Sequence, residues 1–281
     1  MSIITLLTDF GIEDEYVGIM KGVILSINPS AVIVDITHHI SPQDIMDAAY
    51  RIKSSYKYFP EKTVHLIVVD PGVGSARPII AAQIEGHYLL APDNGILTPL
   101  LDDGDIDNVV YVENSEYFLD SVSRTFHGRD IFAPVAAHIS KGLGIMNLGR
   151  PANIKELVRF SVAKPFVSDN GELAGIIISI DHFGNLITNI DYAVFKKFRD
   201  TFCCGKEIDF IVGSKSVTGL SESYSSVKSG MPLAITGSRG YLEIAVNCGS
   251  AKDFFDICKY DKVIIRNGDE LKDYGSNCTI M

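Results

Sequence analysis

The chain has 281 residues, enough for two domains, and its 46 % hydrophobic and 21 % charged residues are typical of a globular protein rather than a disordered one. The net charge of −10 argues against a nucleic-acid binder and against a protein that docks on anionic membranes, because both need a basic surface. The longest apolar run, near residues 173–178, is much shorter than the ~18 residues of a membrane-spanning helix. Because the first ten residues also lack the basic start of a signal peptide, we expect a cytoplasmic protein with no membrane partner.

The first half of the chain alternates apolar strands with helices. The expected strands are Ile3–Leu7, Ala31–Ile36, Thr63–Val69, Pro78–Ile84, His87–Leu90 and Asn108–Val112. Helices are expected from Tyr16 to Ile27, after a cap at Ser41, and from about Ile131 to Ser140, where apolar residues recur with helical spacing. This alternation predicts a mostly parallel sheet covered by helices.

Short strands with glycine-rich turns replace this pattern after about Pro165. The expected strands are Leu173–Ile180, Glu207–Val212, Ser216–Leu220, Leu233–Ile235, Tyr241–Val246 and Lys262–Arg266. Helical periodicity is strong only around Tyr192–Phe198. We therefore predict an α/β N-terminal domain at residues 1–165 and an all-β, barrel-like C-terminal domain at residues 166–281.

Acidic residues stand at the ends of predicted strands in the first domain. Asp9 and Asp70 follow two of these strands and Asp35 lies near the end of another, where ligands of open α/β sheets bind. Turn formation is the alternative role, since Asp-Pro-Gly is a common turn sequence. The segment 72–77 begins like a dinucleotide fingerprint but lacks its third glycine and precedes a strand, which argues against a nucleotide-dependent oxidoreductase.

Three further polar segments are candidates for a site. His127 begins a predicted helix, where it can face a ligand or where Asp130 can act as a local cap. Segments 181–185 and 237–241 are dense in polar groups, and each alone is typical of a hairpin turn. No metal site or disulfide framework is expected, because the histidines have no ligand spacing and the cysteines are odd in number without a Cys-x-x-Cys pair. These cysteines are Cys203, Cys204, Cys248, Cys258 and Cys278.

Six motifs in a fixed order resemble one family over nearly the whole chain. They are Thr-Asp-Phe-Gly at 8–11, Val-Asp-Pro-Gly-Val-Gly at 69–74 followed by Arg77, Ala-Pro-Asp-Asn-Gly at 91–95, Phe-His-Gly-Arg-Asp at 126–130, Asp-His-Phe-Gly-Asn at 181–185 and Ser-Arg-Gly-Tyr at 238–241. With them the chain resembles the S-adenosyl-L-methionine (SAM) hydroxide adenosyltransferases, or adenosine-forming SAM hydrolases. The same superfamily contains the SAM-dependent fluorinase and chlorinase.

The resemblance implies hydrolysis of SAM to adenosine and L-methionine, with SAM as substrate and no cofactor. It also implies a homotrimer, in which each site lies between the first domain of one subunit and the second domain of its neighbour. Asp70, Arg77 and His127 match the water-activating triad of the family. The matching substrate contacts are Asp9 at the ribose hydroxyls, Asp14 near the methionine end, Asp181 at the methionine ammonium, Ser238 and Arg239 at its carboxylate, and Asn185 with the backbone from Val246 to Cys248 at the adenine edge.

Two other functions remain open, a SAM-dependent halogenase and a non-catalytic module that binds SAM or adenosine. In the halogenases that the chain resembles, tyrosine stands at position 70, and tyrosine and serine stand at positions 127 and 128. Asp70, His127 and Gly128 here favour water as the nucleophile.

Water is a weaker acid than an ordinary aspartic acid by ~12 pKa units, or roughly 16 kcal/mol for full proton transfer. We therefore expect Asp70 to orient the water and to accept its proton late, as the bond to C5′ of SAM forms.

Overall fold

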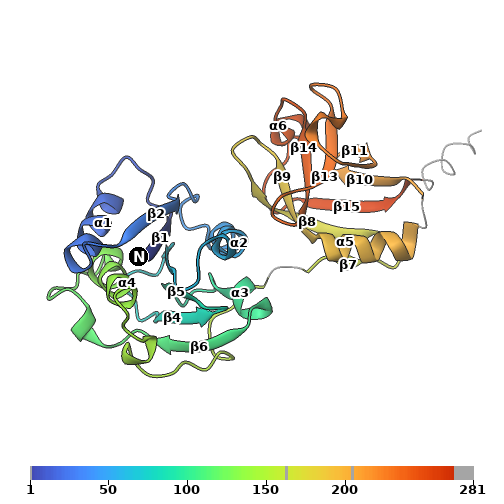
Figure 1. The fold of residues 1–281 in the computed structure, drawn as a ribbon. Helices are drawn as coiled ribbons and strands as arrows, with labels where there is room; N and C mark the ends of the chain where they lie inside the picture. The colour runs from blue at the N-terminus through green and yellow to red at the C-terminus, as the bar shows by residue number, and fades with distance from the viewer. Residues whose placement is uncertain (1, 162–163, 204–205, 269–281) are drawn as a thin grey trace, which may run out of the picture. The chain divides into compact units, whose positions relative to one another are not determined.

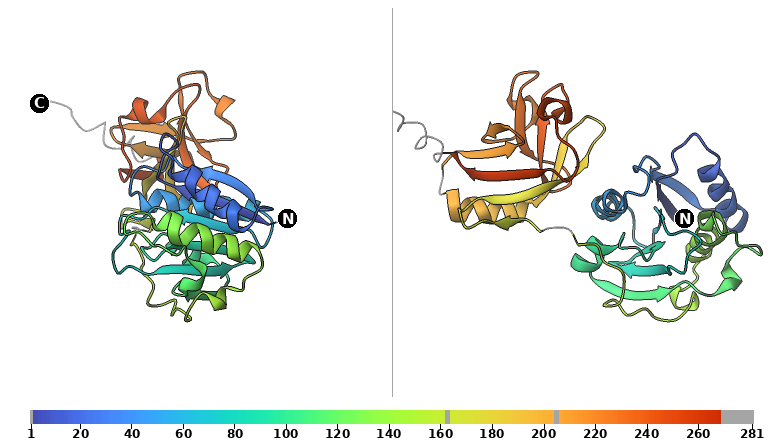
Figure 2. Two further views of the ribbon diagram at one scale, coloured as in Figure 1. Left: turned by 90° about the vertical axis from the view of Figure 1, so that its left-hand side faces the viewer. Right: turned by 180° about the vertical axis from the view of Figure 1, so that it is seen from behind.

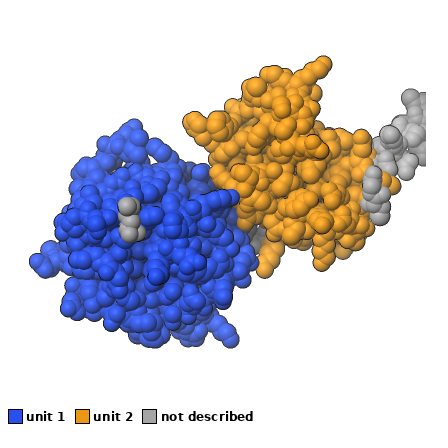
Figure 3. Space-filling view, viewed as in Figure 1, with its two compact units in different colours: residues 1–161 blue, residues 162–281 orange. Residues whose placement is uncertain are grey.

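The computed structural model describes residues 2–161, 164–203 and 206–268. The chain divides into two compact units, residues 1–161 and residues 162–281, and each is described by itself (Figures 1 and 3). Within the described part of the chain, none of the helices has the length and apolar character needed to cross a bilayer.

The first unit is an α/β domain. Its elements are β1 (Ile3–Thr8), α1 (Tyr16–Ile27), β2 (Val32–Thr37), α2 (Ile45–Ser55), β3 (Val64–Val68), β4 (Ile79–Ile84), β5 (His87–Pro92), α3 (Thr98–Asp103), β6 (Ile106–Tyr111) and α4 (Ala133–Ser140). A π-helix at Gly128–Phe132 leads directly into α4. The strands form one sheet in the order β2-β1-β3-β5-β4-β6.

The prediction of a mostly parallel sheet was wrong in this detail, because the sheet is mixed. β2, β1, β3 and β5 are parallel neighbours, whereas β4 pairs antiparallel with both β5 and β6. The reason is local: only Glu85 and Gly86 connect β4 to β5, and both have positive φ angles of 50° and 78°. Two such residues form a tight hairpin turn, which forces the strands on either side to run antiparallel.

Helices cover both faces of this sheet: α1 and α4 lie side by side on one face, as the left view of Figure 2 shows, and α2 and α3 pack on the other. Successive strand residues point to opposite faces, so the neighbours Leu6 and Leu7 belong to different cores. Leu6 packs in the core that contains Met20 of α1, and Leu7 packs in the core that contains Ile52 of α2. All four side chains are fully buried, so β1 is fixed from both sides and the loop after it starts from a rigid strand end.

The second unit consists mainly of strands. Its elements are β7 (Phe166–Val167), β8 (Leu173–Ile180), β9 (Leu186–Asp191), α5 (Tyr192–Phe198), β10 (Ile208–Val212), β11 (Lys215–Thr218), β12 (Leu220–Ser221), β13 (Pro232–Thr236), β14 (Tyr241–Val246), α6 (Ala251–Phe255) and β15 (Lys262–Asn267). The strands follow the order β11-β10-β15-β8-β9-β14-β13-β12, with β7 on β8, in a nearly closed, barrel-like sheet. The barrel-like architecture and the helix at residues 192–198 are confirmed.

One central strand of this unit has no counterpart among the predicted strands. β9 lies between β8 and β14, and its polar residues Thr188 and Asn189 are buried. Thr188 donates its hydroxyl to the Leu242 carbonyl oxygen at 2.9 Å, and Asn189 Oδ1 accepts from the Ile176 amide at 2.9 Å. Polar side chains that are satisfied by neighbouring strands conceal the strand in the sequence, because periodicity records only apolar positions.

Candidate functional site

A cavity of about 410 Å³ lies at the carboxyl ends of β1 and β3 in the first unit. Thr8 and Val68 are in parallel register at these ends, so the loops that follow the two strands leave the sheet side by side. Asp9 on the first loop, Asp70 on the second and His127 from a distant segment all line the cavity. The structure therefore brings together three of the residues selected from the sequence.

Asp70 and Arg77 form a buried, two-pronged ion pair at this cavity. Arg77 Nε donates to Asp70 Oδ1 at 2.7 Å, and Arg77 Nη2 donates to Asp70 Oδ2. The side chain of Asp70 is only 4 % exposed and that of Arg77 only 10 %. Each charge is therefore stabilised mainly by the other and not by water. A guanidinium that grips a carboxylate through two parallel hydrogen bonds fixes the plane of that carboxylate. Asp70 is thus held in one orientation while its remaining lone pairs can still accept hydrogen bonds.

His127 joins this pair through one ring nitrogen. Its Nδ1 lies 3.2 Å from Arg77 Nη2, and a guanidinium has only donors. Nδ1 is therefore the acceptor, and the proton of the neutral ring is on Nε2. Burial, followed by the charge of Arg77, lowers the pKa of His127 below its ordinary value of 6.5, so the ring is neutral at pH 7. The site thus presents a carboxylate acceptor and an imidazole donor side by side.

Gly74 brings the loop after β3 against the loop before His127. Its φ angle is +76°, and a Cβ atom at this position would lie 2.1 Å from the Arg124 carbonyl oxygen. A side chain is excluded both by this contact and by the left-handed backbone. On the other loop, the buried Asp130 carboxylate accepts from the Ser123 amide at 2.7 Å. These two contacts hold the loop that carries Asp70 close to the segment that carries His127.

Asp9 lies on the same cavity, where its Oδ2 accepts from the Gln43 amide at 2.8 Å. Burial raises the pKa of Asp9, although this backbone hydrogen bond opposes the shift. An aromatic cluster of Phe10, Tyr16 and Phe126 borders the cavity, with ring centroids 5.1–6.0 Å apart. The sequence reasoning gave these rings no role in the site, although two of them flank the motif residues Asp9 and His127. They supply flat apolar surface next to a carboxylate.

Asp14 does not line this cavity. It is exposed and lies just before α1. Its expected place near the methionine end of the substrate stays a prediction.

The second unit brings Asp181 and Asn185 together in the turn between β8 and β9. Asp181 Oδ1 accepts from the amides of Phe183 and Asn185, each at 2.9 Å, and Oδ2 accepts from Asn185 Nδ2 at 2.8 Å. The carboxylate thus orders its own turn. Three of its roughly four acceptor positions are used, which leaves one for an ammonium group.

Glu243, which the sequence reasoning missed, lies beneath the Ser238–Arg239 turn. It is 5 % exposed, and a Cβ on Gly237 would lie 1.8 Å from its Oε1. Tyr224 donates its hydroxyl to Glu243 Oε2 at 3.1 Å. Burial raises the pKa of Glu243, a shift that Arg239 opposes and Asp181 strengthens. Burial, followed by the charge of Glu243, raises the pKa of Tyr224 to about 12. Asp181 and Arg239 are therefore in one electrostatic group with a buried acid.

The segment Ser250–Lys252, which follows the turn at Val246–Cys248, lies against the Asp181–Asn185 turn. A Cβ on Gly184 would lie 2.3 Å from Ser250 Oγ, and the Lys252 amide donates to the Gly184 carbonyl oxygen at 2.9 Å. Cys248 is exposed and has a φ angle of +55°. The residues expected at the adenine edge therefore belong to two turns that are linked through Ser250 and Lys252.

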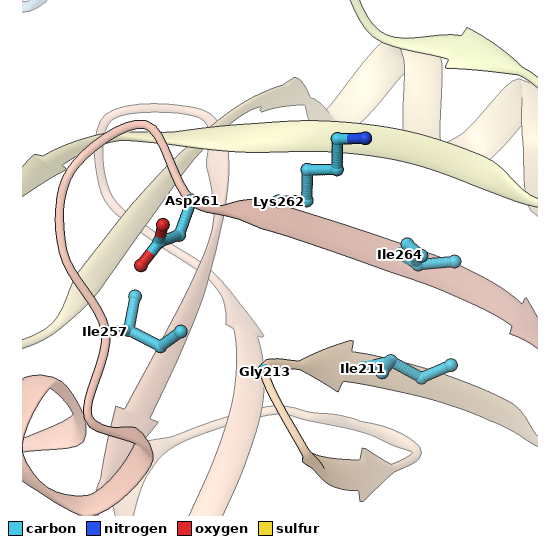
Figure 4. A pocket seen from close by; sticks show the side chains of 6 residues that line it. All are labelled: Ile211, Gly213, Ile257, Asp261, Lys262 and Ile264. Atoms are coloured by element: carbon cyan, nitrogen blue, oxygen red, sulfur yellow. The ribbon is translucent and has the colours of Figure 1, made fainter.

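A second cavity of about 360 Å³ lies in the same unit and contains none of the predicted site residues (Figure 4). Ile211 and Ile264, which are register partners on β10 and β15, form its apolar side. Its acid, Asp261, accepts from the Cys258 amide at 2.8 Å and so holds a turn. This cavity has no arrangement of groups that would perform chemistry.

Within residues 2–161, 164–203 and 206–268, no group of three or more His, Cys, Asp or Glu side chains has the arrangement of a metal site. Of the cysteines, Cys203 is buried and Cys248 and Cys258 are exposed. Cys204 and Cys278 lie outside the described residues.

Comparison with known proteins places both units in one family. The family model described as the SAM hydroxide adenosyltransferase N-terminal domain matches residues 4–149, and that of the C-terminal domain matches residues 175–264. A protein of Thermus thermophilus named (R)-S-adenosyl-L-methionine hydrolase is 36 % identical over 88 % of this chain and 92 % of its own length. A fluorinase of an Actinoplanes species is 33 % identical over 67 % of this chain and 71 % of its own length.

A solved structure has the same fold. The crystal structure of an uncharacterized conserved protein from Thermotoga maritima superimposes with a TM-score of 0.87 at 37 % identity, over 94 % of this chain and all of that one. Because both family models match in order and relatives above 30 % identity span most of the sequence, this chain belongs to the SAM hydroxide adenosyltransferase family.

Proposed function

We propose that this protein hydrolyses SAM to adenosine and L-methionine by in-line attack of water on C5′. The observation that carries the proposal is that Asp70 and His127 line the cavity with Asp9, while Arg77 binds both of them. A module that only binds SAM or adenosine needs a ribose contact, but it has no use for a carboxylate and an imidazole fixed by the same arginine. Relatives named (R)-S-adenosyl-L-methionine hydrolase support the same reaction.

The reaction depends more on the position of the attacking water than on the strength of the base. The sulfonium leaves as a neutral thioether, so no metal ion is needed to stabilise the leaving group. In our mechanism the water donates one hydrogen to Asp70 and accepts one from the Nε2–H of His127. Its remaining lone pair then faces C5′. As the C–O bond forms and the C–S bond breaks, the donated proton passes to Asp70 and later to solvent. Well-oriented reactants can recover about 7–11 kcal/mol of a barrier.

The role of Arg77 is to hold these two groups. One guanidinium binds both oxygens of Asp70 and the Nδ1 of His127. It thereby sets the imidazole tautomer and prevents the carboxylate from rotating. The donor and the acceptor that face the water are fixed before the substrate binds, which reduces the reorganisation needed for reaction.

Space at position 128 argues against a halogenase. A Cβ on Gly128 would lie 3.2 Å from Met20 Sδ and 3.2 Å from Phe126 Cε2. A serine at this position, as in the halogenase branch, would therefore need its neighbours to move. The polar group that would hold a halide is absent from this position, and the surroundings of Gly128 are a thioether and aromatic rings.

The substrate contacts complete the proposal. Asp9 holds the ribose hydroxyls, since one carboxylate can accept two hydrogen bonds. In the second unit Asp181 binds the methionine ammonium, Ser238 and Arg239 bind its carboxylate, and Asn185 with the Val246–Cys248 backbone contacts adenine. Asp14 approaches the methionine end.

We further propose the homotrimer implied by the family, with sites between neighbouring subunits, in the cytoplasm. Light scattering coupled to size-exclusion chromatography tests the trimer, and cell fractionation tests the compartment.

The test is chromatography of the full-length protein incubated with SAM, with and without chloride or fluoride. Because the relatives are named for the (R) epimer, the (R)- and (S)-sulfonium epimers are assayed separately. We expect adenosine and methionine in equal amounts, independent of halide. A 5′-halogenated nucleoside would establish the halogenase instead, and adenosine binding without turnover would leave only a binding module.

Asp70→Asn separates catalysis from binding. The amide is similar in shape and can still accept from Arg77, but it is a much poorer proton acceptor than a carboxylate. We expect turnover to fall by about 10²–10⁴-fold, with adenosine affinity within about threefold of the wild type. An equal loss of turnover and of affinity would contradict the role given to Asp70.

A further inference from the structure

A buried histidine that the proposed mechanism does not use lies beside the Asp9 loop. His38 is 4 % exposed, and its Nδ1 lies 2.9 Å from the hydroxyl of Thr8, which is fully buried at the end of β1. Its Nε2 lies 3.1 Å from Asp35 Oδ1, a close electrostatic contact whose angle is poor for a hydrogen bond. Lys21 of α1 binds the other oxygen of Asp35 at 2.6 Å. A line of polar contacts thus runs from the surface to Thr8.

The hydrogen bonds define the direction of this line. Burial opposes the shift, but the contacts with Lys21 and His38 lower the pKa of Asp35, so the carboxylate is ionised and favours a proton on the nearest ring nitrogen, Nε2. Nδ1 is then an acceptor for the hydroxyl hydrogen of Thr8. The Thr8 oxygen in turn accepts from the Phe10 amide at 3.2 Å. The side chain of His38 therefore fixes the rotamer of Thr8, and Thr8 fixes the backbone just after Asp9.

His38 holds the other end of the same turn through its backbone. Its carbonyl oxygen accepts from the Gly11 amide at 2.8 Å. Residues 8, 10 and 11 are thus all connected to His38 directly or through Thr8, and Asp9 lies between them. Apart from the contact with the Gln43 amide, the Asp9 carboxylate faces the cavity. Its position there depends on the turn that carries it.

We propose that His38 is a positioning residue, which acts through Thr8 and Gly11 to aim the Asp9 carboxylate at the two ribose hydroxyls of the substrate. This inference rests on the proposed function, in which Asp9 binds the ribose, and it adds a residue from outside the cavity wall. The ribose selectivity of the site then depends on the tautomer of His38 in which Nε2 carries the proton and Nδ1 accepts from Thr8.

The first unit contains a matched control. Thr5 and His65 form the same kind of contact, hydroxyl to Nδ1 at 2.8 Å, between buried residues of β1 and β3. Neither residue lines the cavity. A substitution at His65 therefore measures what the loss of a buried threonine–histidine pair does to the unit in general, without a change in the Asp9 turn.

Two substitutions of His38 separate its ring nitrogens. The amide of His38→Asn reaches the place of Nδ1 and can still accept from Thr8, whereas the amide of His38→Gln reaches the place of Nε2 and leaves Thr8 without its acceptor. The measurement is calorimetric binding of adenosine and of 2′,3′-dideoxyadenosine to the full-length protein. The readout is the ratio of the two affinities, because loss of folded protein changes the number of sites but not this ratio.

We expect the wild type, His38→Asn and His65→Gln to prefer adenosine to a similar degree, and His38→Gln to lose this preference by about tenfold, which is the value of one hydrogen bond to a charged group. Thr8→Val, which has nearly the same volume, is expected to behave like His38→Gln and serves if that variant does not fold. If His38→Gln and Thr8→Val keep the wild-type preference for adenosine, His38 has no positioning role, and the ribose contact of Asp9 is unaffected by that result. A wild type without any preference contradicts the ribose contact of Asp9, and the proposal fails with it.

Discussion

The two neighbouring histidines in the core of the first unit, His65 and His87, predict that acid destabilises this protein. His65 is fully buried, and its Nε2 lies 3.2 Å from His87 Nδ1. Burial, followed by the neighbouring His87, lowers the pKa of His65 from 6.5 to about 3. The unfolded chain therefore binds a proton between pH 6.5 and 3 that the folded chain does not bind, and stability falls as the pH falls through this window.

The size of the effect follows from the two pKa values. With 6.5 for the unfolded chain and about 3 for the folded one, the free energy of unfolding at pH 5 is lower than at pH 8 by about 2 kcal/mol from His65 alone. Burial also lowers the pKa of His87, so this histidine adds to the loss in the same direction.

The assay is urea denaturation of the full-length protein at pH 8 and pH 5, followed by circular dichroism. His65→Leu is expected to lose about 2 kcal/mol less than the wild type between the two pH values, because other titrating groups cancel in the comparison. Thr5→Val removes the hydrogen bond between the Thr5 hydroxyl and His65 Nδ1 at 2.8 Å but keeps the imidazole. This variant should therefore retain the full pH dependence. Equal pH dependence in the wild type and His65→Leu would refute the reasoning.

Four further predictions concern the site. Gly74→Ala places a methyl group 2.1 Å from the Arg124 carbonyl oxygen, and the strained φ alone costs about 1–3 kcal/mol; we expect a lower melting temperature together with reduced kcat, and unchanged values of both would contradict the packing argument. Asp181→Asn, whose amide oxygen can still accept from the Phe183 and Asn185 amides, should weaken SAM and methionine in calorimetry more than adenosine, whereas equal losses of all three would exclude the assignment of Asp181 to the ammonium. Because the pKa of His127 is lowered below 6.5, kcat should fall in acid with a midpoint below pH 6.5, and a fall centred above 6.5 would argue against a neutral donor. Turnover should survive EDTA, and recovery only on addition of a divalent metal would end the metal-free mechanism.

The site in the first unit could be predicted from the sequence because its residues follow strand ends. Asp9 and Asp70 each come one or two residues after a buried parallel strand, and neighbouring parallel strands end at the same edge. Periodicity is sufficient to find such strands. His127 was a candidate as the start of a predicted helix, but only the resemblance to a family assigned it to the same triad as Arg77, since no local pattern places residue 127 beside residue 77.

Features that depend on contacts between distant segments could not be predicted. Glu243 looks like an ordinary acid in a strand, and its burial against Gly237 appears only when β13 and β14 pair. The threonine–histidine contacts behind Asp9 likewise join residues thirty positions apart. The mixed sheet was a different kind of error, because only two residues separate the predicted strands Pro78–Ile84 and His87–Leu90, and a connection this short already indicates an antiparallel hairpin.

The π-helix after His127 gives the site a simple evolutionary reading. The Ala133 amide donates to the Gly128 carbonyl oxygen, five residues earlier, where an α-helix would use a residue four earlier. One extra residue in an otherwise regular helix accounts for this spacing. Removal of one residue from 128–132 would turn everything before it by about 100° around the helix axis and separate His127 from Arg77. A single codon insertion could therefore have brought the imidazole to the arginine, and a single deletion would undo it.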